Sequence, residues 1–402
     1  MFEFVEFDFD FVSIIGTLTD TVSIVLVSVL AGCLIVQLLY YWLFLAKPNR
    51  RARAVKRVKK KVGEAQPPVS VIVCAKNQAQ RLREYMPILL EQNYPIYEVI
   101  FVDDDSSDET SEVIGLLSQR YPQLYHTYVP AETMSLSRRK LGLTIGIKAA
   151  KYDTLLFTDA CCVPNSPDWI SKMSRHFKTL DTVVLGFSAL DSHSKSYAVY
   201  DYYFSNLKMA TMALLGKSYM ANGKNLAYSK ERFLKERGFS NSNIMDLGED
   251  DLFVDEIAPK CNFAVELSPE SVITASLNEY QTWRDMKNNR GMTGAYYKWF
   301  PKVFWAVEAW TRIGFYASLI ASAIWVLVVT KSAYSSEWFI LFGVAALLRL
   351  FTQWLVVNRT ASALGLPKFY LSLPLFDIIQ PFVDEYFLFY QRIRGRKSYR
   401  KS

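Results

Sequence analysis

Three groups of carboxylates in this sequence could take part in chemistry. Residues 103–105 are three consecutive aspartates after an apolar run, and Asp159 follows another apolar run. Residues 249–251 are a glutamate and two aspartates directly after Gly248. Carboxylates can coordinate a divalent cation or accept a proton from a reacting hydroxyl group. The three groups are therefore candidates for one binding or catalytic site.

Each group also has a structural explanation. An aspartate after a strand can cap the next helix, and acidic residues in the first turn of a helix interact favourably with its dipole. A helix needs one cap, however, and three adjacent carboxylates repel one another. We therefore expect Asp103 or Asp104 to bind a ligand. Asp159 alone is a weak signal, and the 249–251 group alone is explained by the helix dipole.

The elements that must position these carboxylates alternate between strand and helix patterns. Apolar runs predict buried strands over 69–75, 97–104, 124–129 and 154–160. Amphipathic or helix-forming stretches between them predict helices near 78–92, 108–120 and 137–150. This alternation predicts an α/β domain with a parallel sheet, in which ligands bind at the carboxyl ends of the strands. The aspartates at 103–105 and 159 fall at such ends.

Four segments together resemble a known family: PVSVIVCAKNQ, YPIYEVIFVDDDSSDET, LLFTDACC and GEDDLF. In order and spacing they are similar to family-2 glycosyltransferases with the GT-A fold, over about residues 68–300. A bacterial membrane-anchored subgroup is similar in having an anchor before the domain and spans after it. GKSYMANGKNLAYSK and a helix starting Thr-Trp also recur in that subgroup. The resemblance implies a GT-A domain, Rossmann-like with a mostly parallel sheet, plus α-helical transmembrane segments.

The resemblance also implies roles for individual residues. The positions that hold the nucleotide base are Ala75, Asn77, Asp103 and Asp104. Asp159 corresponds to the first aspartate of the family's Asp-x-Asp element, beside the ribose and diphosphate. Asp250 corresponds to the general base of a Glu-Asp motif whose glutamate is Glu249.

Two elements depart from the family pattern. The Asp-x-Asp element reads Asp159-Ala160-Cys161, so Cys161 stands where the family has its usual second metal ligand. The resemblance implies Mg²⁺ or Mn²⁺ with Asp159 as a ligand, but a thiol suits Mg²⁺ poorly and Mn²⁺ less poorly. The Gln-x-x-Arg-Trp element, which normally binds the diphosphate and the acceptor end, has Met286 and Asn289 in place of Gln and Arg.

Basic residues could offset the diphosphate charge instead. Arg290 and Lys287 lie in the degraded element, and Lys140 follows Arg138 and Arg139 at the start of a predicted helix. The alternative for these last three residues is a solvated helix turn.

An aromatic stretch at 196–216 leaves two interpretations open. It could lie on a membrane surface or line an acceptor groove, or it could be a helix packed on the domain's own core.

The placement of charge indicates a membrane protein rather than a nucleic-acid binder. The net charge is +7, but residues 47–61 hold nine basic residues and 392–402 hold six, so the rest of the chain is acidic. A soluble nucleic-acid binder should carry its basic residues on the folded domain. The 26 uncharged residues at 21–46 would span about 39 Å as a helix, more than the roughly 30 Å of a bilayer core.

The positive-inside rule then predicts the domain organisation. We expect an extracytoplasmic N-terminus (1–20), a transmembrane helix (21–46), a basic juxtamembrane linker (47–67), a GT-A domain facing the cytoplasm (68–300), two transmembrane helices (301–358), and a last segment with a basic cytoplasmic tail (359–402).

Two features of the C-terminal part carry further expectations. Arg349, within a predicted span, is expected to pack against a neighbouring element. Residues 369–391 are apolar but carry Asp377, and Pro374 and Pro381 are expected to break a straight helix. We interpret this stretch as re-entrant or interfacial.

These features predict a multi-pass glycosyltransferase of the bacterial inner membrane. It would move a sugar, with inversion, from a nucleotide-sugar donor (a UDP-sugar above others) to a lipid-linked or glycan acceptor. Membrane lipids are expected partners and nucleic acid is not. The alternative hypothesis is a pseudoglycosyltransferase that serves as a binding or scaffold subunit of a membrane assembly, because Cys161, Met286 and Asn289 depart from the family.

Overall fold

The computed structural model describes residues 21–57, 66–132, 137–191, 193–240, 245–277, 282–330 and 335–398. The predictions for 1–20, for 58–65 of the linker and for the end of the tail lie outside these residues. The chain divides into two units. The helical unit comprises Met1–Ala46, Lys302–Asn358 and Phe369–Val383, and the α/β unit comprises Lys47–Pro301, Arg359–Lys368 and Asp384–Ser402.

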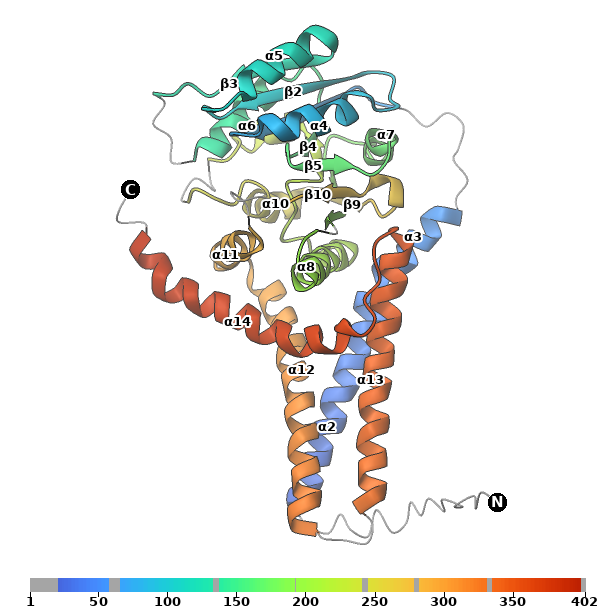
Figure 1. Cartoon of the computed structure of the whole chain (residues 1–402). Coiled ribbons are helices and arrows are strands. Elements are labelled where there is room, and N and C mark those ends of the chain that lie inside the picture. The colour runs from blue at the N-terminus through green and yellow to red at the C-terminus, as the bar shows by residue number, and fades with distance from the viewer. Residues whose placement is uncertain are drawn as a thin grey trace. The chain divides into compact units, whose positions relative to one another are not determined.

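The α/β unit is built on a seven-stranded sheet with the strand order β3-β2-β1-β4-β8-β6-β9 (Figure 1). Its strands are β1 (Val69–Ala75), β2 (Tyr97–Asp103), β3 (Leu124–Tyr128), β4 (Thr154–Thr158), β6 (Thr182–Leu185), β8 (Leu226–Ser229) and β9 (Asn262–Val265). β8 runs antiparallel to β4 and β6, and the other neighbouring pairs are parallel. The predicted α/β class with a mostly parallel sheet is confirmed.

Helices cover both faces of β1, β2 and β3. Successive side chains of a strand point to opposite sides of the sheet, so each face can bury apolar side chains against helices. The helices of this unit are α3 (Lys47–Arg57), α4 (Ala79–Leu90), α5 (Thr110–Arg120), α6 (Arg138–Ala149), α7 (Trp169–Ser174), α8 (Ser196–Leu214), α9 (Lys230–Lys235), α10 (Asp251–Ile257) and α11 (Trp283–Gly294). Val71 and Val73 belong to one core with the buried residues of α4 and α5. On the other face, a Cβ on Gly142 of α6 would lie 2.6 Å from Cys74 Sγ, so glycine permits the close approach of α6.

Short elements complete this unit. The strands β5 (Cys162–Pro164), β7 (Ser188–Leu190) and β10 (Ile273–Ala275) form a second sheet in the order β5-β10-β7. Two 3₁₀ turns, η2 (Ala258–Lys260) and η3 (Pro269–Ser271), flank β9. The aromatic stretch at 196–216 forms α8, most of whose side chains are buried. Of the two interpretations, packing on the domain's own core is therefore confirmed for α8.

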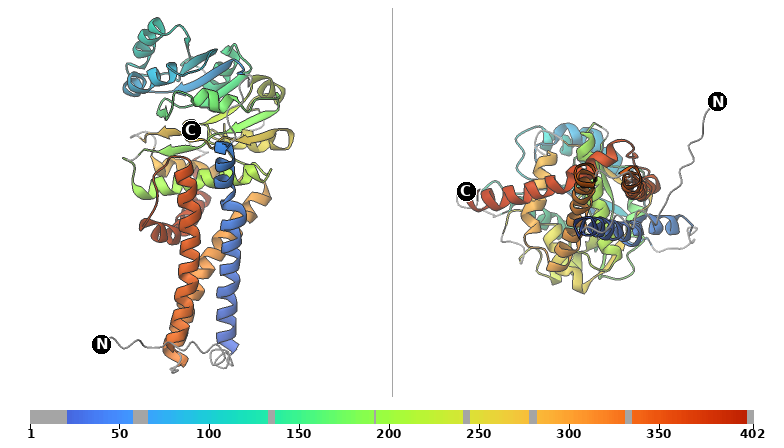
Figure 2. Two further views of the ribbon diagram at one scale, coloured as in Figure 1. Left: turned by 90° about the vertical axis from the view of Figure 1, so that its right-hand side faces the viewer. Right: turned by 90° about the horizontal axis from the view of Figure 1, so that it is seen from below.

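The helical unit contains long apolar helices that run alongside one another (Figure 2). Its elements are α2 (Thr21–Leu39), the π-helical η1 (Tyr40–Leu45), α12 (Trp299–Trp325), η4 (Val326–Thr330), α13 (Ser335–Ala363) and the start of α14 (Ser372–Ser398). Within the residues that the structure describes, three helical stretches are long and apolar enough to cross a membrane: Thr21–Val55, Trp299–Val328 and Glu337–Ala363. Large apolar side chains on these helices, such as Val29, Ile320 and Leu347, are exposed. Such a surface suits lipid rather than water.

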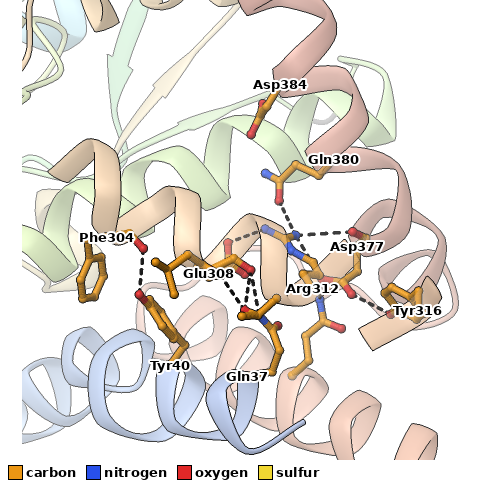
Figure 3. A network of polar contacts seen from close by, with 12 residues as sticks. Gln37, Tyr40, Phe304, Glu308, Arg312, Tyr316, Asp377, Gln380 and Asp384 are labelled. Atoms are coloured by element: carbon orange, nitrogen blue, oxygen red, sulfur yellow. Dashed lines mark hydrogen bonds and ion pairs between the residues drawn. The ribbon is translucent and has the colours of Figure 1, made fainter. Parts of the chain in front are cut away.

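A buried polar cluster lies among these helices (Figure 3). Arg349 Nη1 lies 2.6 Å from Asp377 Oδ2, and Arg312 Nη1 lies 3.2 Å from Asp377 Oδ1. Arg312 Nη2 also contacts Glu308 at 2.7 Å, and Arg349 Nη2 donates to Gln37 at 3.0 Å. The prediction that Arg349 packs against protein is confirmed, and its main partner is Asp377.

One local expectation, about Pro381, was wrong, and the proposed linker stays a prediction. The proposed linker begins as helix α3, in which Pro48 occupies the first turn, where its missing N–H has no helical partner to lose. Pro381 does not break α14. A proline at 381 removes the backbone donor for the carbonyl of Asp377, and Arg312 Nη1 donates to that oxygen at 3.4 Å. The replaced hydrogen bond explains why the helix continues.

Candidate active site

The predicted base-binding residues meet at the carboxyl edge of β1 and β2. Ala75 and Asp103 are partners in the parallel ladder, and Asp104 N donates to Ala75 O at 2.9 Å. Asn77 follows with a φ of 53°, a left-handed conformation that asparagine tolerates. Its Oδ1 accepts from Ser107 N at 2.8 Å, which joins the two loops.

Asp103 and Asp104 differ in what their carboxylates do. Asp103 is buried, and it accepts hydrogen bonds from Ser106 N (3.1 Å) and Ser111 Oγ (2.7 Å), so it braces the turn that leads into α5. Asp104 is partly exposed and accepts from Arg138 Nε at 2.8 Å. Asp104 is therefore the better placed of the two to meet a ligand.

The first turn of α6 connects the three carboxylate groups. Ser137 caps the helix by accepting from Lys140 N at 3.2 Å. Arg138 then bonds to Asp104, and the next residue, Arg139, contacts both Asp159 Oδ1 and Glu249 Oε1 at 2.6 Å. The sequence placed these arginines in a possible solvated turn, whereas the structure places them between the acids. They hold the separate motifs together.

The side chain of Lys140 is directed at a backbone carbonyl. Its side chain is buried, and Nζ donates to the carbonyl of Met245 at 2.9 Å. That bond ties α6 to the loop before the 249–251 group. A nucleotide-binding role for Lys140 stays a prediction.

Asp159 lies in the turn after β4 and is held by a cation on each oxygen. Arg139 is at Oδ1, and Lys224 Nζ is 2.5 Å from Oδ2. Lys224 Nζ is also 3.4 Å from Cys161 Sγ, and the sulfurs of Cys161 and Cys162 are 3.9 Å apart. The side chains of Asp159 and Lys224 are less than a tenth exposed. This is a buried ion pair with a thiol beside it.

Electrostatics keep this cluster ionised. Burial raises the pKa of Asp159, but Arg139 and Lys224 outweigh burial and lower that pKa below its ordinary value. Burial lowers the pKa of Lys224, but the carboxylate of Asp159 raises it well above its ordinary value. The pKa of Cys161 is lowered, first by the hydrogen bond with Cys162 and then by the Lys224 ammonium.

Asp250 and Glu249 precede α10. Asp250 caps the helix, with Oδ1 accepting from Asp251 N and Oδ2 from Gly223 N, both at 2.8 Å. A Cβ on residue 223 would lie 3.1 Å from Asp250 Oδ2, so a glycine there permits the contact. Two backbone donors fix the direction of the carboxylate, which is partly exposed and retains free lone pairs. Glu249 is engaged by Arg139.

Asp251 is a further carboxylate of this group that the sequence did not single out. It is buried, and its Oδ2 accepts from Tyr297 OH at 2.5 Å. Burial, with repulsion from Asp250, raises its pKa to about 7. Arg290 of α11 lies 5.8 Å from the ring centroid of Tyr202 and, by its charge, lowers the pKa of Asp251. A nucleotide-binding role for Arg290 stays a prediction.

The other residues of α11 considered as site candidates make contacts that hold the helix in place. The helix starts at Trp283 behind a Thr282–Asp285 capping box, as the Thr-Trp pattern implied. Lys287 forms ion pairs with Asp201, at 2.8 Å, and with Asp384. Its charge is therefore already matched by two carboxylates.

The predicted Mg²⁺ or Mn²⁺ can be tested against the donor atoms. In the described part of the chain, Asp159, Cys161 and Cys162 bring ligand atoms within 4.8 Å of one another. Two thiols are poor ligands for hard cations. Both oxygens of Asp159 are also occupied by positive side chains. The residues present fit a divalent cation poorly.

Lys224 is the main residue that sequence reasoning missed. It lies in the GKSYMANGKNLAYSK segment, directly after Gly223 and just before β8. A lysine so close to a buried strand was a signal that the sequence offered. It did not identify the partner, because Asp159 is distant in sequence. Tyr297 escaped notice for the same reason.

Comparisons with known proteins show similarity to one family and to a solved fold. Residues 70–233 match the model of Glycosyl transferase family 2. A poly-beta-1,6-N-acetyl-D-glucosamine synthase of Staphylococcus epidermidis is 28% identical over 127 residues, 31% of this chain and 28% of the relative's own length. The solved structure of the mannosyltransferase PcManGT from Pyrobaculum calidifontis, in complex with GDP-Man and Mn²⁺, has 19% identity and a TM-score of 0.50. It covers 85% of this chain and 97% of that one.

Proposed function

Since residues 70–233 form a family-2 glycosyltransferase domain, we propose that the chain transfers a sugar from a nucleotide-sugar donor to an acceptor hydroxyl group. The transfer inverts the anomeric configuration, and the acceptor is a lipid-linked sugar or a glycan. A UDP-sugar is the proposed donor. The proposal extends the family match to the activity of the whole chain.

The proposed reaction needs one base and positive charge at the leaving group. Asp250 accepts the proton of the acceptor hydroxyl as its oxygen attacks the anomeric carbon. The bond from that carbon to the diphosphate oxygen breaks, and the nucleoside diphosphate leaves with the electron pair. Attack opposite the leaving group gives inversion. Ala75, Asn77 and Asp104 hold the base and ribose.

One observation carries this proposal. Arg138 and Arg139, adjacent on α6, bind Asp104, Asp159 and Glu249, which come from three different loops. Ligands of α/β sheets bind at this carboxyl edge. Acids from the base-binding, diphosphate and catalytic motifs are therefore gathered at one place.

We also propose the bacterial inner membrane as the location, with the α/β unit in the cytoplasm. Three candidate spans and the basic residues that follow the first of them support this topology. A reporter fused at Met1 should be inactive if it works only in the cytoplasm, and the same reporter after Ser402 should be active. The reverse pattern would contradict the topology.

Helix α14 supports the interfacial interpretation of its segment. Its exposed apolar side chains recur every three or four residues, which places them on one helical face: Leu375, Ile378, Phe382, Tyr386, Phe389 and Ile393. Basic residues follow at the end of the helix. An apolar face next to basic residues is typical of helices that lie on a lipid surface, where a lipid-linked acceptor would be within reach.

The test is nucleotide release from UDP-, GDP- and dTDP-sugars by the purified full chain, with a lipid-linked or glycan acceptor. Release that depends on the acceptor and on Asp250 supports the proposal.

The second candidate is the pseudoglycosyltransferase scaffold, which Cys161 favours because it replaces the usual metal ligand. In that case Asp250→Asn would change neither sugar transfer in cells nor assembly with partners.

A further inference from the structure

The starting point is the set of contacts around Asp159. An ammonium and a guanidinium occupy its two oxygens, Lys224 at Oδ2 and Arg139 at Oδ1. Lys224 also reaches Cys161 Sγ at 3.4 Å. The lysine therefore bridges the two positions of the Asp-x-Asp element, which the family resemblance assigns to a metal.

The backbone holds Lys224 at this point. Lys224 N donates to Asn222 Oδ1 at 3.2 Å, and Asn225 N donates to Asn222 O at 2.9 Å. Asn225 is itself anchored, since its side chain donates to Phe187 O at 2.8 Å. The turn before β8 is thus rigidly tied, and the ammonium is directed at Asp159 rather than at solvent.

A divalent cation and this ammonium would compete for the same place. A metal bound to a carboxylate oxygen lies about 2.0–2.6 Å from it. Lys224 Nζ lies 2.5 Å from Oδ2 of Asp159. Two positive ions so close in a buried site would repel each other strongly.

We propose that the ammonium of Lys224 takes the place of the divalent cation, so that this chain binds its nucleoside-diphosphate sugar without metal. Lys224 fixes Asp159 and Cys161, and Arg139 supplies the accessible positive charge. The side chain of Arg139 is 38% exposed, compared with 7% for Lys224. Two monovalent side chains thus provide the charge that one divalent ion would provide. This inference rests on the proposed function.

The substitution at 161 fits this arrangement. An aspartate there would place a second carboxylate within reach of the one lysine and restore an oxygen donor set that suits Mn²⁺. Cysteine accepts a weak hydrogen bond from the ammonium and adds no fixed carboxylate charge. In the proposed arrangement, Cys161 and Lys224 therefore act together.

The first experiment measures Mn²⁺ binding by the purified full chain from the loss of the free-ion EPR signal. Wild type should bind no Mn²⁺ at this site, with or without UDP. The double variant Cys161→Asp with Lys224→Met should gain Mn²⁺ binding. Binding by wild type that is lost in Asp159→Asn would overturn the inference.

The second experiment measures the thermal stabilisation of the chain by UDP, in excess EDTA and in excess Mn²⁺. UDP should raise the unfolding temperature of the wild type by the same amount in EDTA and in Mn²⁺. Lys224→Met should weaken UDP binding by about 10- to 100-fold, as expected for a lost charge-assisted interaction. Lys235→Met, the same change at an exposed lysine of α9, is the matched control. Lys224→Arg, which keeps the charge, distinguishes lost charge from a disturbed fold.

The outcomes distinguish a failure of the metal-free site from a failure of the proposed function. Stabilisation by UDP in Mn²⁺ but not in EDTA would overturn the metal-free site and leave the glycosyltransferase proposal intact. No stabilisation by UDP, GDP or dTDP in either condition would overturn the proposed function, and with it this inference.

Discussion

Each unit of this protein buries a cluster of two acids and two bases. In the α/β unit the members are Asp159, Glu249, Arg139 and Lys224, and in the helical unit they are Glu308, Asp377, Arg312 and Arg349 (Figure 3). The four side chains of the helical unit are at most 1% exposed. Arg139 is 38% exposed.

The two clusters differ in exposure, and we expect this difference to separate their roles. In the enclosed cluster, the amide of Gln353 and the hydroxyl of Tyr316 also donate hydrogen bonds to Asp377, so a ligand would have to break existing bonds. In the open cluster, one cation reaches solvent and a partly exposed acid, Asp250, lies nearby. We therefore expect the enclosed cluster to stabilise the helical unit and the open cluster to take part in ligand binding. Four substitutions test this contrast.

Asp377→Ala should have the largest effect. It leaves Arg312 and Arg349 buried without their shared carboxylate, which costs on the order of 3–5 kcal/mol for a broken buried pair. Thermal unfolding of the purified chain in detergent measures the loss. Glu385→Ala, an exposed acid of the same helix, should be neutral. Equal stability of the two variants would show that the enclosed cluster has no cohesive role.

Asp250→Asn should abolish most turnover and leave the overall fold intact. The amide keeps the size of the side chain, and its one oxygen can still accept the helix-cap hydrogen bond from Asp251 N, but its NH2 group cannot accept from Gly223 N and the amide cannot take a proton. We expect a loss of about 10² or more in kcat with nearly intact donor binding. Steady-state kinetics and UDP binding measure the two quantities. A loss of donor binding with unchanged kcat would assign Asp250 to binding instead.

Asp104→Ala should remove most of the stabilisation by UDP. Its carboxylate is partly exposed at the edge of β1 and β2 and holds Arg138. We expect affinity to fall by about 10- to 100-fold, measured by calorimetry. Asp105→Asn is the matched control, because the neighbouring side chain is 47% exposed, its carboxylate lies as far as 3.8 Å from Arg138 Nη2, and asparagine tolerates the positive φ of 59° at this position. Equal losses in both variants would place the ligand elsewhere.

Asp251→Asn should change how stability depends on pH. Burial raises the pKa of Asp251 to about 7 from 3.8. The folded state therefore holds a proton that the unfolded state releases, and stability falls as pH rises from about 4 to about 7. The variant should lose this slope and gain a few degrees in Tm relative to wild type at pH 8 but not at pH 4. Asp246→Asn, at an exposed position, should keep the slope.

The strands were predictable because buried parallel strands appear as continuous apolar runs. β1 has the predicted bounds, and β2 ends one residue early, at Asp103. The carboxylates at 103–104 and 159 were predictable because they follow such strands directly. Periodicity and composition depend on residues that are close together in sequence. They therefore do not reveal contacts between distant segments.

The ion pairs needed information that the sequence does not carry locally. Lys224 lies 65 residues from Asp159, and Gln37 lies 312 residues from Arg349. Pro381 was expected to break its helix, because the compensating donor, Arg312, is 65 residues from the freed carbonyl of Asp377. Chemistry could be assigned to single residues, but their partners required the fold.

The position of β4 in the sheet has a consequence for synthesis of the chain. β4 pairs with β1, which is made earlier, and with β8, which follows about 70 residues later, and such distant pairings slow folding. Lys224 lies two residues before the start of β8, so its ammonium reaches Asp159 only when β8 adds to the sheet. On the proposed function, a nascent chain that stops before β8 holds an incomplete donor site, and nucleotide binding would report the moment at which β8 joins the sheet.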